Sequence, residues 1–246
     1  MKELQAPWLS IITVCYNDGL NLEKTVKSIR GQHLSDLQSI VVDGGSSDNT
    51  SDVIKANLDV ITDWVSEKDN GIYDAMNKGL TMAKGKYILF LNAGDLFHSQ
   101  EVLTRVKYLA RDEDILYGNS VVVNEDGSPK SDYHKITPTN LTWRDFRYGM
   151  VVNHQAIFAK KSIAASYDLQ YKISSDIDWA IRTVKQANKI KNLQMIVCDF
   201  QAGGISSQKR MLALRERWKI LQNHFGIIQT FLSHSSIVIQ NLKRLF

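Results

Sequence analysis

Buried strands and amphipathic helices alternate through the first 91 residues, and this alternation constrains the fold more than any other feature of the sequence. Residues 9–15 form an apolar run rich in β-branched side chains, as expected of a strand covered on both faces. The predicted strands are 9–15, 39–42, 60–65 and 87–91, and the predicted helices are 21–31, 48–58 and 72–83. This order predicts an α/β fold with a mostly parallel central sheet and helices on both faces.

The pattern is less regular after residue 91. Further strands are predicted at 115–123, 151–160 and 195–200, and further helices at 175–187 and from residue 211 onward. Residues 133–150 show neither period but carry Trp143 and Tyr148, large anchors that suit a lid. We see no internal repeat, linker or low-complexity tract. We therefore expect one domain over residues 1–208, followed by a basic, amphipathic helical tail over residues 209–246.

The positive charge of the chain is concentrated in that tail. The formal net charge of the whole chain is +4, which is too small to indicate nucleic acid as a partner. From Lys209 to the end, seven Lys or Arg residues accompany a single acid, Glu216. Apolar residues lie between them, and polar residues at 233–236 interrupt the run. This composition is typical of an interfacial helix on a membrane surface, and equally of a helix that packs against the body or a second subunit.

The sequence also bears on location. The first ten residues contain no apolar signal region, and no run of 18 apolar residues is long enough to span a membrane. We expect a cytoplasmic protein, peripheral on the inner face of the plasma membrane through its tail. The two cysteines, Cys15 and Cys198, lie in apolar stretches and are expected to be buried thiols without a disulfide or metal role.

Polar and acidic residues follow each of the first four predicted strands. The four strand ends read "CYND", "DGGSSD", "SEKDNG" and "LNAGD". Because ligands of open α/β sheets bind beyond the carboxyl ends of the strands, we expect these residues to surround a ligand at one edge. Aspartate and asparagine are also common turn and cap residues, so each position has a purely structural alternative.

The stretch "IVVDGGSSDNT", residues 40–50, indicates a nucleotide site at the second strand end. No P-loop and no G-x-G-x-x-G fingerprint occurs in the chain. Instead, the carboxylate of Asp43 precedes Gly44 and Gly45. Asp43 can accept a hydrogen bond from an N–H of uracil, thymine or guanine, while the glycines allow the base to approach closely.

The stretch "FLNAGD", residues 90–95, delivers Asp95 from an apolar strand through a short polar turn. A carboxylate fixed there suits Mg²⁺ or Mn²⁺, hard cations that often use one or two protein carboxylates together with substrate phosphates. The structural alternative is that Asp95 caps a helix beginning near Ser99.

Taken in order, these segments resemble the family 2 glycosyltransferases, nucleotide-sugar-dependent enzymes of the GT-A type. The resemblance covers residues 7–207 and rests on "LSIITVCYN", "IVVDGGSSDNT", "DNGIYDAMNKGLTMAKGKYILFLNAGD", "VNHQAIF" and "SSDIDWAIR". Within the family, the sequence is most similar to bacterial exopolysaccharide enzymes of the colanic-acid type. The family's metal motif usually carries two acids, whereas Asn92 to Asp95 retains only the last. By similarity, Asp95 is the metal ligand, for Mg²⁺ or Mn²⁺.

The resemblance implies a donor side and an acceptor side. Nucleotide or donor contacts fall on Tyr16, Asn17, Asp43, Gly44, Asp74, Asn77, Lys209 and Arg210. Asp74 and Asn77 follow Tyr73 on one predicted helix and suit the donor sugar or ribose. Lys209 and Arg210 follow the flexible stretch "QAGGISSQ", which can close over a diphosphate.

An inverting transfer needs a carboxylate that takes the proton of the acceptor hydroxyl. Asp176 matches the family's base position, with Ser175 replacing the first acid of the motif. Asp178 is the alternative base, although two positions along a helix point in different directions. Asp176 can also be read as a helix cap. His154 and Gln155, on the strand predicted at 151–160, are assigned to acceptor or donor contact, against the alternative of a core histidine.

We therefore expect a metal-dependent, inverting, hexosyltransferase-like enzyme. The expected donor is a UDP-, GDP- or dTDP-sugar, and the expected acceptor is a lipid-linked saccharide in surface exopolysaccharide or lipopolysaccharide biosynthesis. A homo-oligomer is compatible with the tail. Two alternatives remain: a nucleotidyltransferase, which would release pyrophosphate instead of a nucleoside diphosphate, and a non-catalytic nucleotide-sugar-binding protein.

Overall fold

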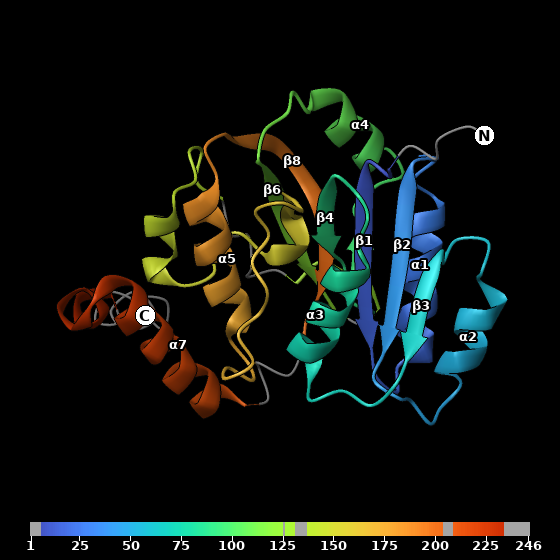
Figure 1. Ribbon diagram of the computed structural model, residues 1–246, viewed down its shortest axis with the longest axis horizontal. Helices are drawn as coiled ribbons and strands as arrows, with labels where there is room; N and C mark the ends of the chain where they lie inside the picture. The colour runs from blue at the N-terminus through green and yellow to red at the C-terminus, as the bar shows by residue number, and fades with distance from the viewer. Residues whose placement is uncertain (1–5, 125, 131–136, 204–208, 234–246) are drawn as a thin grey trace.

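The computed structural model describes residues 6–124, 126–130, 137–203 and 209–233. Within these residues, eight strands form one sheet in the order β3-β2-β1-β4-β7-β6-β8-β5 (Figure 1). The strands are β1 (Leu9–Cys15), β2 (Leu37–Asp43), β3 (Asp63–Ser66), β4 (Tyr87–Phe90), β5 (Leu96–Phe97), β6 (Ile115–Val123), β7 (Ile157–Lys160) and β8 (Ile190–Gln201). The helices are α1 (Gly19–Arg30), α2 (Thr50–Ala56), α3 (Ile72–Met82), α4 (Val102–Leu109), α5 (Ser175–Gln186) and α7 (Arg210–Phe225), with 3-10 turns η1 (Trp143–Tyr148) and η2 (His154–Ala156).

The first half of the chain forms the parallel part of the sheet. Strand β1 pairs in parallel with β2 and β4, and β2 pairs in parallel with β3. Every residue of β1 and β4 is buried, which explains their continuous apolar sequence. Helix α3 lies close to β1 because Gly79 has no side chain: a Cβ atom there would stand 2.4 Å from Ile12. The predicted β-α-β order of this half is confirmed.

The second half of the chain adds antiparallel strand pairs, so the whole sheet is mixed, while the parallel arrangement predicted from the first half holds for β1 to β4. Strand β7 pairs antiparallel with both β4 and β6, and β5 pairs antiparallel with β8, while β6 and β8 are parallel. The predicted strand at 151–160 is only half right. It begins at Ile157, so His154 and Gln155 lie in the 3-10 turn η2 before the strand.

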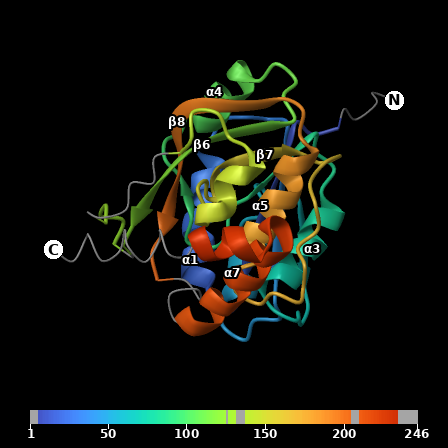
Figure 2. The ribbon, with the colours of Figure 1, turned by 90° about the vertical axis from the view of Figure 1, so that its left-hand side faces the viewer.

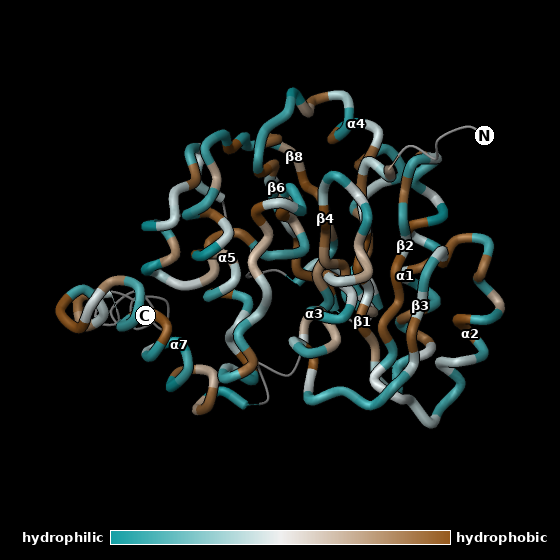
Figure 3. The backbone as a smooth tube through the Cα atoms, viewed as in Figure 1, coloured by the Kyte–Doolittle hydropathy of each residue, from teal (hydrophilic) through white to brown (hydrophobic). Residues whose placement is uncertain are grey.

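Helices cover both faces of this sheet. Helices α3 and α5 lie on one face and α1 on the other (Figures 1 and 2). The hydrophobic segments gather in the central strands, and the loops at the lower edge of the view are mostly hydrophilic (Figure 3). Cys15 and Cys198 are both buried free thiols, as predicted.

Helix α7 packs against α5 at one end of the molecule (Figure 2). It buries Glu216, Ile220 and Leu221, and Phe225 stacks on the ring of Trp143 with centroids 5.2 Å apart. The first turns of the predicted tail therefore have the contacts of a packing helix. Of the irregular stretch 133–150, residues 133–136 lie outside the described residues, and residues 143–148 form η1 beside α5.

Candidate active site

The carboxyl ends of the first strands meet at one edge of the sheet, the lower edge in Figure 1. The registers align Cys15 with Asp43, and Asp43 with Ser66. The backbone N–H of Ala93, just beyond β4, donates to the carbonyl of Val14 at 3.2 Å. The strand ends that the sequence marked as polar are therefore neighbours in space.

Asp43 organises the turn that follows β2. Its side chain is fully buried and accepts hydrogen bonds from Ser46 N at 3.1 Å and from Ser66 Oγ at 2.5 Å, as well as from Ser46 Oγ. These bonds tie the turn of β2 to the end of β3. A nucleotide base that reaches Asp43 must therefore compete with serine hydroxyls of the protein itself.

Three residues lie against one another beside Asp43: the exposed Tyr16, the buried Gly44 and the half-buried Asp69. The Tyr16 side chain is 65 % exposed. A Cβ atom on Gly44 would lie 3.2 Å from the Tyr16 ring and 2.5 Å from a carboxylate oxygen of Asp69, so only glycine fits between them. Asp69 was not singled out from the sequence, although its position at a strand exit, shortly before Gly71, was an available signal.

Asn17 joins two of these turns. It adopts φ 49°, in the left-handed region that asparagine tolerates. Its N–H donates to Ser46 Oγ at 2.7 Å, and its side-chain oxygen accepts from Ser47 N at 2.8 Å. Asn17 therefore fixes the end of β1 against the turn after β2.

The two α3 residues assigned to the donor have different surroundings. Asp74 is half-buried and accepts from Asn70 N at 2.9 Å, which closes the start of the helix. Asn77 makes two hydrogen bonds to the backbone of Tyr167, at 2.7 and 2.9 Å. The Asn77 amide thus holds the segment before α5 against α3. A sugar donor that contacts Asn77 would have to share an amide that already bonds to the Tyr167 backbone.

Asp95 is a buried carboxyl group in the turn after β4. Its side chain is 3 % exposed, and it accepts from Gln155 Nε2 at 3.0 Å and from the backbone N–H of Gln201 at 3.1 Å. Both donors are neutral, and burial raises the pKa of Asp95 to about 7. Thr25 on α1 steadies the turn by donating to the carbonyl of Asp95 at 3.0 Å.

The donor atoms around Asp95 fit a hard divalent cation. The Oδ1 atom of Asn92, in the same turn, is buried and has no hydrogen-bond partner among the described residues. A carboxylate with no cationic neighbour and an unpartnered amide oxygen are both ligands that Mg²⁺ and Mn²⁺ accept. No cluster of three His, Cys, Asp or Glu occurs within the described residues, so oxygens of a substrate would have to complete the coordination.

His154 and Gln155 lie in η2, which contacts the turn of Asp95 through Gln155. Gln155 is the donor to Asp95. His154 is 7 % exposed, lies edge-on to the rings of Phe90 and Tyr167, and burial lowers its pKa to about 4. It is therefore neutral at physiological pH. The geometry gives Gln155 a supporting contact to Asp95 and places His154 in an aromatic cluster.

Asp176 lies in the first turn of α5, beside the aromatic cluster. It is half-buried, and the hydroxyl of Tyr73 is 3.4 Å from its Oδ1. Ser174 occupies the N-cap position of α5 and makes no side-chain cap bond to the helix. Tyr73 stacks on Tyr167, and Tyr167 on Trp179, with centroids 5.1 and 5.5 Å apart. Asp176 therefore stands where α3 and α5 meet.

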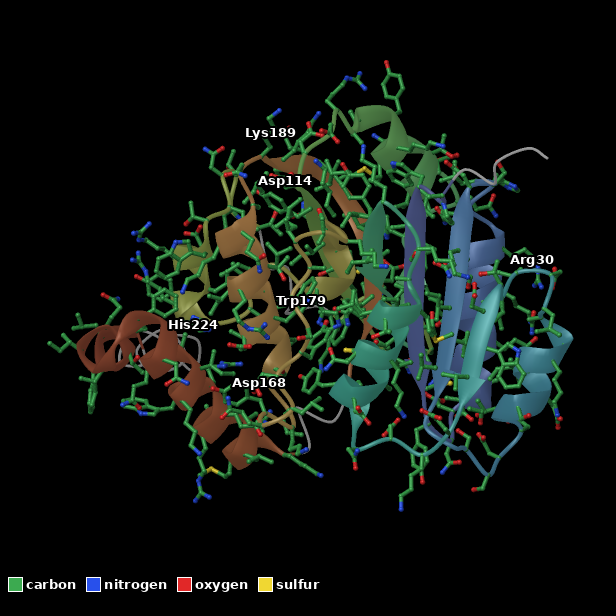
Figure 4. All side chains as sticks on the ribbon, in the orientation of Figure 1. Arg30, Asp114, Asp168, Trp179, Lys189 and His224 are labelled. Carbon is green, nitrogen blue, oxygen red and sulfur yellow. The ribbon has the colours of Figure 1, made fainter. Side chains whose placement is uncertain are left out.

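Asp178 points the other way, into the contact between α5 and α7. It is 5 % exposed and accepts from Arg182 Nε at 2.7 Å and from His224 Nε2 at 2.8 Å. His224 lies between α7 and α5 (Figure 4). Although burial opposes it, the hydrogen bonds from His224 and Arg182 keep the pKa of Asp178 below its ordinary value. The structure thus gives Asp178 a structural ion pair.

Lys209 and Arg210 stand at the start of α7, and both are exposed. The loop before them, residues 204–208, lies outside the described residues. The start of α7 lies toward the same lower edge as the ends of β1, β2 and β3 (Figure 1). No helix within the described part of the chain has the length and hydrophobicity to cross a membrane.

This arrangement, an α/β sheet whose strand ends carry Asp43 and Asp95, is that of the GT-A class of fold. The solved structure of Staphylococcus aureus TarS (residues 1–349) in complex with UDP-GlcNAc superimposes with a TM-score of 0.70 at 17 % identity, over 93 % of this chain and 72 % of that one. A mannosyltransferase from Pyrobaculum calidifontis in complex with GDP-Man and Mn²⁺ gives a TM-score of 0.65 at 16 % identity, covering 95 % and 70 %.

The sequence comparisons identify the family. The family model "Glycosyl transferase family 2" matches residues 10–166. A glycosyltransferase of Mycobacterium tuberculosis (strain ATCC 25618 / H37Rv), itself described as uncharacterized, is 31 % identical over 218 residues, which are 85 % of this chain and 80 % of that protein. The chain belongs to glycosyl transferase family 2, and the predicted family and fold are confirmed.

Proposed function

We propose that this glycosyltransferase is metal-dependent and inverting, and that it transfers a sugar from a nucleoside-diphosphate sugar to a saccharide acceptor. The observation that carries the proposal is the turn of Asn92 and Asp95. Burial of this carboxyl group between neutral donors favours its protonated form, and a cation bound there and to the unpartnered Asn92 oxygen would favour the ionised form instead. The ligands of TarS and of the archaeal mannosyltransferase are consistent with a nucleotide-sugar donor.

We assign the donor to the edge formed by β1, β2 and β3. The base would stack beside Tyr16 over Gly44, with Asp69 able to accept from a base or ribose donor. Asp43 and Asn17 hold this turn in shape. Lys209 and Arg210 would approach the diphosphate from the start of α7. Asp95, with Asn92, would hold Mg²⁺ or Mn²⁺, which when bound neutralises charge on the departing diphosphate.

Asp176 serves as the general base in this proposal. It is half-buried rather than sealed, whereas Asp178 is occupied by Arg182 and His224. Asp176 takes the proton of the acceptor hydroxyl as the oxygen forms its bond to the anomeric carbon. The bond from that carbon to the diphosphate oxygen breaks, and the configuration at the carbon inverts.

The acceptor side rests on the resemblance to exopolysaccharide enzymes of the colanic-acid type. A lipid-linked saccharide at the inner face of the plasma membrane agrees with the surface that follows α7, where Ile227, Ile228, Phe231 and Leu232 are all more than half exposed. We propose a catalytic domain over residues 1–208 and a tail over residues 209–246, in which α7 packs on α5. The exposed residues after it are the part that suits a membrane surface or a second subunit.

Nucleotide binding tests the donor and metal assignments together. Nucleoside diphosphates of uridine, guanosine and thymidine are titrated with Mn²⁺ by calorimetry and thermal shift. We expect one of them to stabilise the protein, with a Mn²⁺-dependent increment that grows from pH 6 to pH 8. It grows because the cation binds the deprotonated form of Asp95, whose pKa is about 7.

Asp95→Asn keeps the size of the side chain and should lose the Mn²⁺-dependent increment. The matched control is Asp199→Asn, an acid on neighbouring β8 that contacts His98 at 2.7 Å; it should keep the increment. If Asp95→Asn binds donor and metal as well as the unmodified protein does, the metal site is not at this turn.

A further inference from the structure

Glu216, a buried acid on α7, contacts the loop that precedes Asp176. Glu216 is 6 % exposed, and its carboxylate accepts hydrogen bonds from three consecutive backbone N–H groups. They are Lys172 N at 2.7 Å, Ile173 N at 2.8 Å and Ser174 N at 3.0 Å. Ser174 is the N-cap residue of α5, so Glu216 holds the backbone two residues before Asp176.

The same loop is held from its other side by α3. The hydroxyl of Tyr73 donates to the carbonyl of Ile173 at 2.8 Å and stands 3.4 Å from Asp176 Oδ1. The peptide groups of Ile173 thus lie between Tyr73 and Glu216. Because Tyr73 and Glu216 are both buried, neither side chain can move away from the loop without disturbing the packing around it.

A carboxylate is the side chain that this contact requires. Oε1 accepts from Lys172, and Oε2 accepts from both Ile173 and Ser174. An ionised carboxylate is an acceptor at both oxygens, whereas an amide is a donor at one of its two positions. A negative charge is also favourable at the N-terminus of α5, where backbone N–H groups are left without partners inside the helix.

Residues one and two helical turns along α7 strengthen this docking. Ala213 accepts through its carbonyl from Ser174 Oγ at 3.3 Å, and Asn223 donates to the hydroxyl of Tyr171 at 3.1 Å. With Glu216 and buried Ile220, they recur at intervals of three and four residues and so share one face of α7. That face is fitted to residues 171–174.

We propose that Glu216 is a positioning residue for the general base: it fixes the backbone from which Asp176 projects. The proposal rests on the role given to Asp176 under the proposed function. It makes α7 part of the catalytic apparatus, although none of its residues from 213 to 224 need touch the substrate.

The test is Glu216→Gln, which has the same shape but places an NH₂ group against at least one backbone N–H. We expect kcat to fall about 10- to 100-fold, the scale of loss from a small misplacement of a catalytic group. KM for the donor should change less than twofold. Glu216→Asp keeps both acceptor oxygens on a shorter side chain, so its kcat should lie between that of the unmodified protein and that of Glu216→Gln. It replaces Glu216→Gln in the test if that variant does not fold.

Two comparisons separate positioning from general support. Asn223→Ala removes another contact between α7 and the same loop and should leave kcat within about twofold. In an Asp176→Asn background, Glu216→Gln should cause no further loss of the residual turnover, because residues that act as a unit are not additive. Equal losses in both backgrounds, or an unchanged kcat, would overturn the proposal.

Hydrogen exchange measured by mass spectrometry decides the point independently of activity. Glu216→Gln should speed exchange of the amides of residues 172–176, and Asn223→Ala should not. If those amides exchange at the rate of the unmodified protein, Glu216 does not hold the loop, whatever reaction the chain catalyses. If they do speed up while no donor is turned over, the proposed function fails and the structural contact stands.

Discussion

Asp176 and Asp178 are two positions apart on α5, and their surroundings separate their roles. Asp178 is sealed between Arg182 and His224, whereas Asp176 is half-buried beside Tyr73. Asp176→Asn cannot accept a proton, so we expect turnover to fall by about 10² to 10⁴, with donor binding intact. Asp178→Asn should retain more turnover and instead lower the melting temperature, because it weakens a buried ion pair between two helices.

Steady-state kinetics and calorimetry on the two variants make the comparison. The opposite pattern, with Asp178→Asn inactive and Asp176→Asn active, would exchange their roles. If both variants remain active, the base lies outside α5.

We expect Asp43 to support donor binding by holding the turn after β2. Asp43→Asn replaces an acceptor oxygen by a donor that faces Ser46 or Ser66, and we expect donor binding to weaken by about 1 to 3 kcal/mol, the cost of mismatching buried polar groups. Ser66→Ala removes only one of these bonds and should have a smaller effect. Calorimetric titration of the nucleotide measures both, and an affinity unaffected by Asp43→Asn would contradict this role.

His154 makes stability depend on pH. Burial lowers its pKa from 6.5 to about 4, so below pH 6.5 the unfolded chain binds a proton that the folded protein excludes. The free energy of unfolding therefore falls as the pH drops from about 6.5 to about 4. At about 1.36 kcal/mol per pKa unit, this group alone accounts for roughly 3 to 4 kcal/mol.

His154→Phe removes that ionisation and keeps an aromatic ring beside Phe90. Urea unfolding at pH 7 and at pH 4.5 should show a smaller loss of stability in the variant than in the unmodified protein. An equal loss would mean that His154 is protonated in the fold, contrary to its burial.

At the scale of elements, α7 and the residues after it have separable roles. Deleting residues 227–246 removes Ile227, Ile228, Phe231 and Leu232, which are exposed, so we expect a folded protein that no longer sediments with vesicles containing anionic lipid. Deleting residues 210–246 also removes Glu216, Ile220 and Leu221, which are buried, so we expect a marked loss of thermal stability.

Vesicle sedimentation and thermal melting read out the two deletions. If the shorter deletion still binds vesicles, the membrane surface lies elsewhere. If it instead abolishes a dimer in solution, the exposed residues serve a second subunit.

The elements that could be predicted are those that a local sequence pattern defines without knowledge of their partners. Strands β1 and β6 have the bounds predicted from the sequence, residues 9–15 and 115–123. The mixed half could not be predicted, because the antiparallel pairing of β7 with β4 depends on partners about 70 residues apart. Strand β8 begins at Ile190, five residues before the predicted start. Its first five residues are mostly only partly buried and do not form an apolar run, so the sequence did not indicate them.

The site follows the same division. Asp43 and Asp95 could be found because Asp43 ends the buried strand β2 and Asp95 follows the buried strand β4 after a short turn. Asp69 also follows a strand, but only the structure shows that it lies beside Gly44. Glu216 could not be found, because it contacts a backbone 42 to 44 residues earlier in the chain.

At the scale of the whole molecule, a cluster of aromatic rings joins β4 and α3 to α5. Phe90 of β4 packs edge-on against Tyr167 and Trp179, with centroids 5.1 and 5.5 Å apart, and Tyr167 stacks on Tyr73 of α3. Trp179, on α5, lies near the centre of the molecule (Figure 4). This packing sets Asp176 at a fixed place relative to β4, whose end leads to Asp95.

Product analysis tests the central claim most directly. The full chain is incubated with UDP-, GDP- and dTDP-sugars, Mn²⁺ and lipid-linked saccharide acceptors, and the released nucleotide is identified by chromatography and phosphorus NMR. We predict acceptor-dependent release of a nucleoside diphosphate from one donor, abolished by EDTA and by Asp95→Asn, together with a product of inverted anomeric configuration. Release of pyrophosphate, or release that persists unchanged without metal and in Asp95→Asn, would contradict the account.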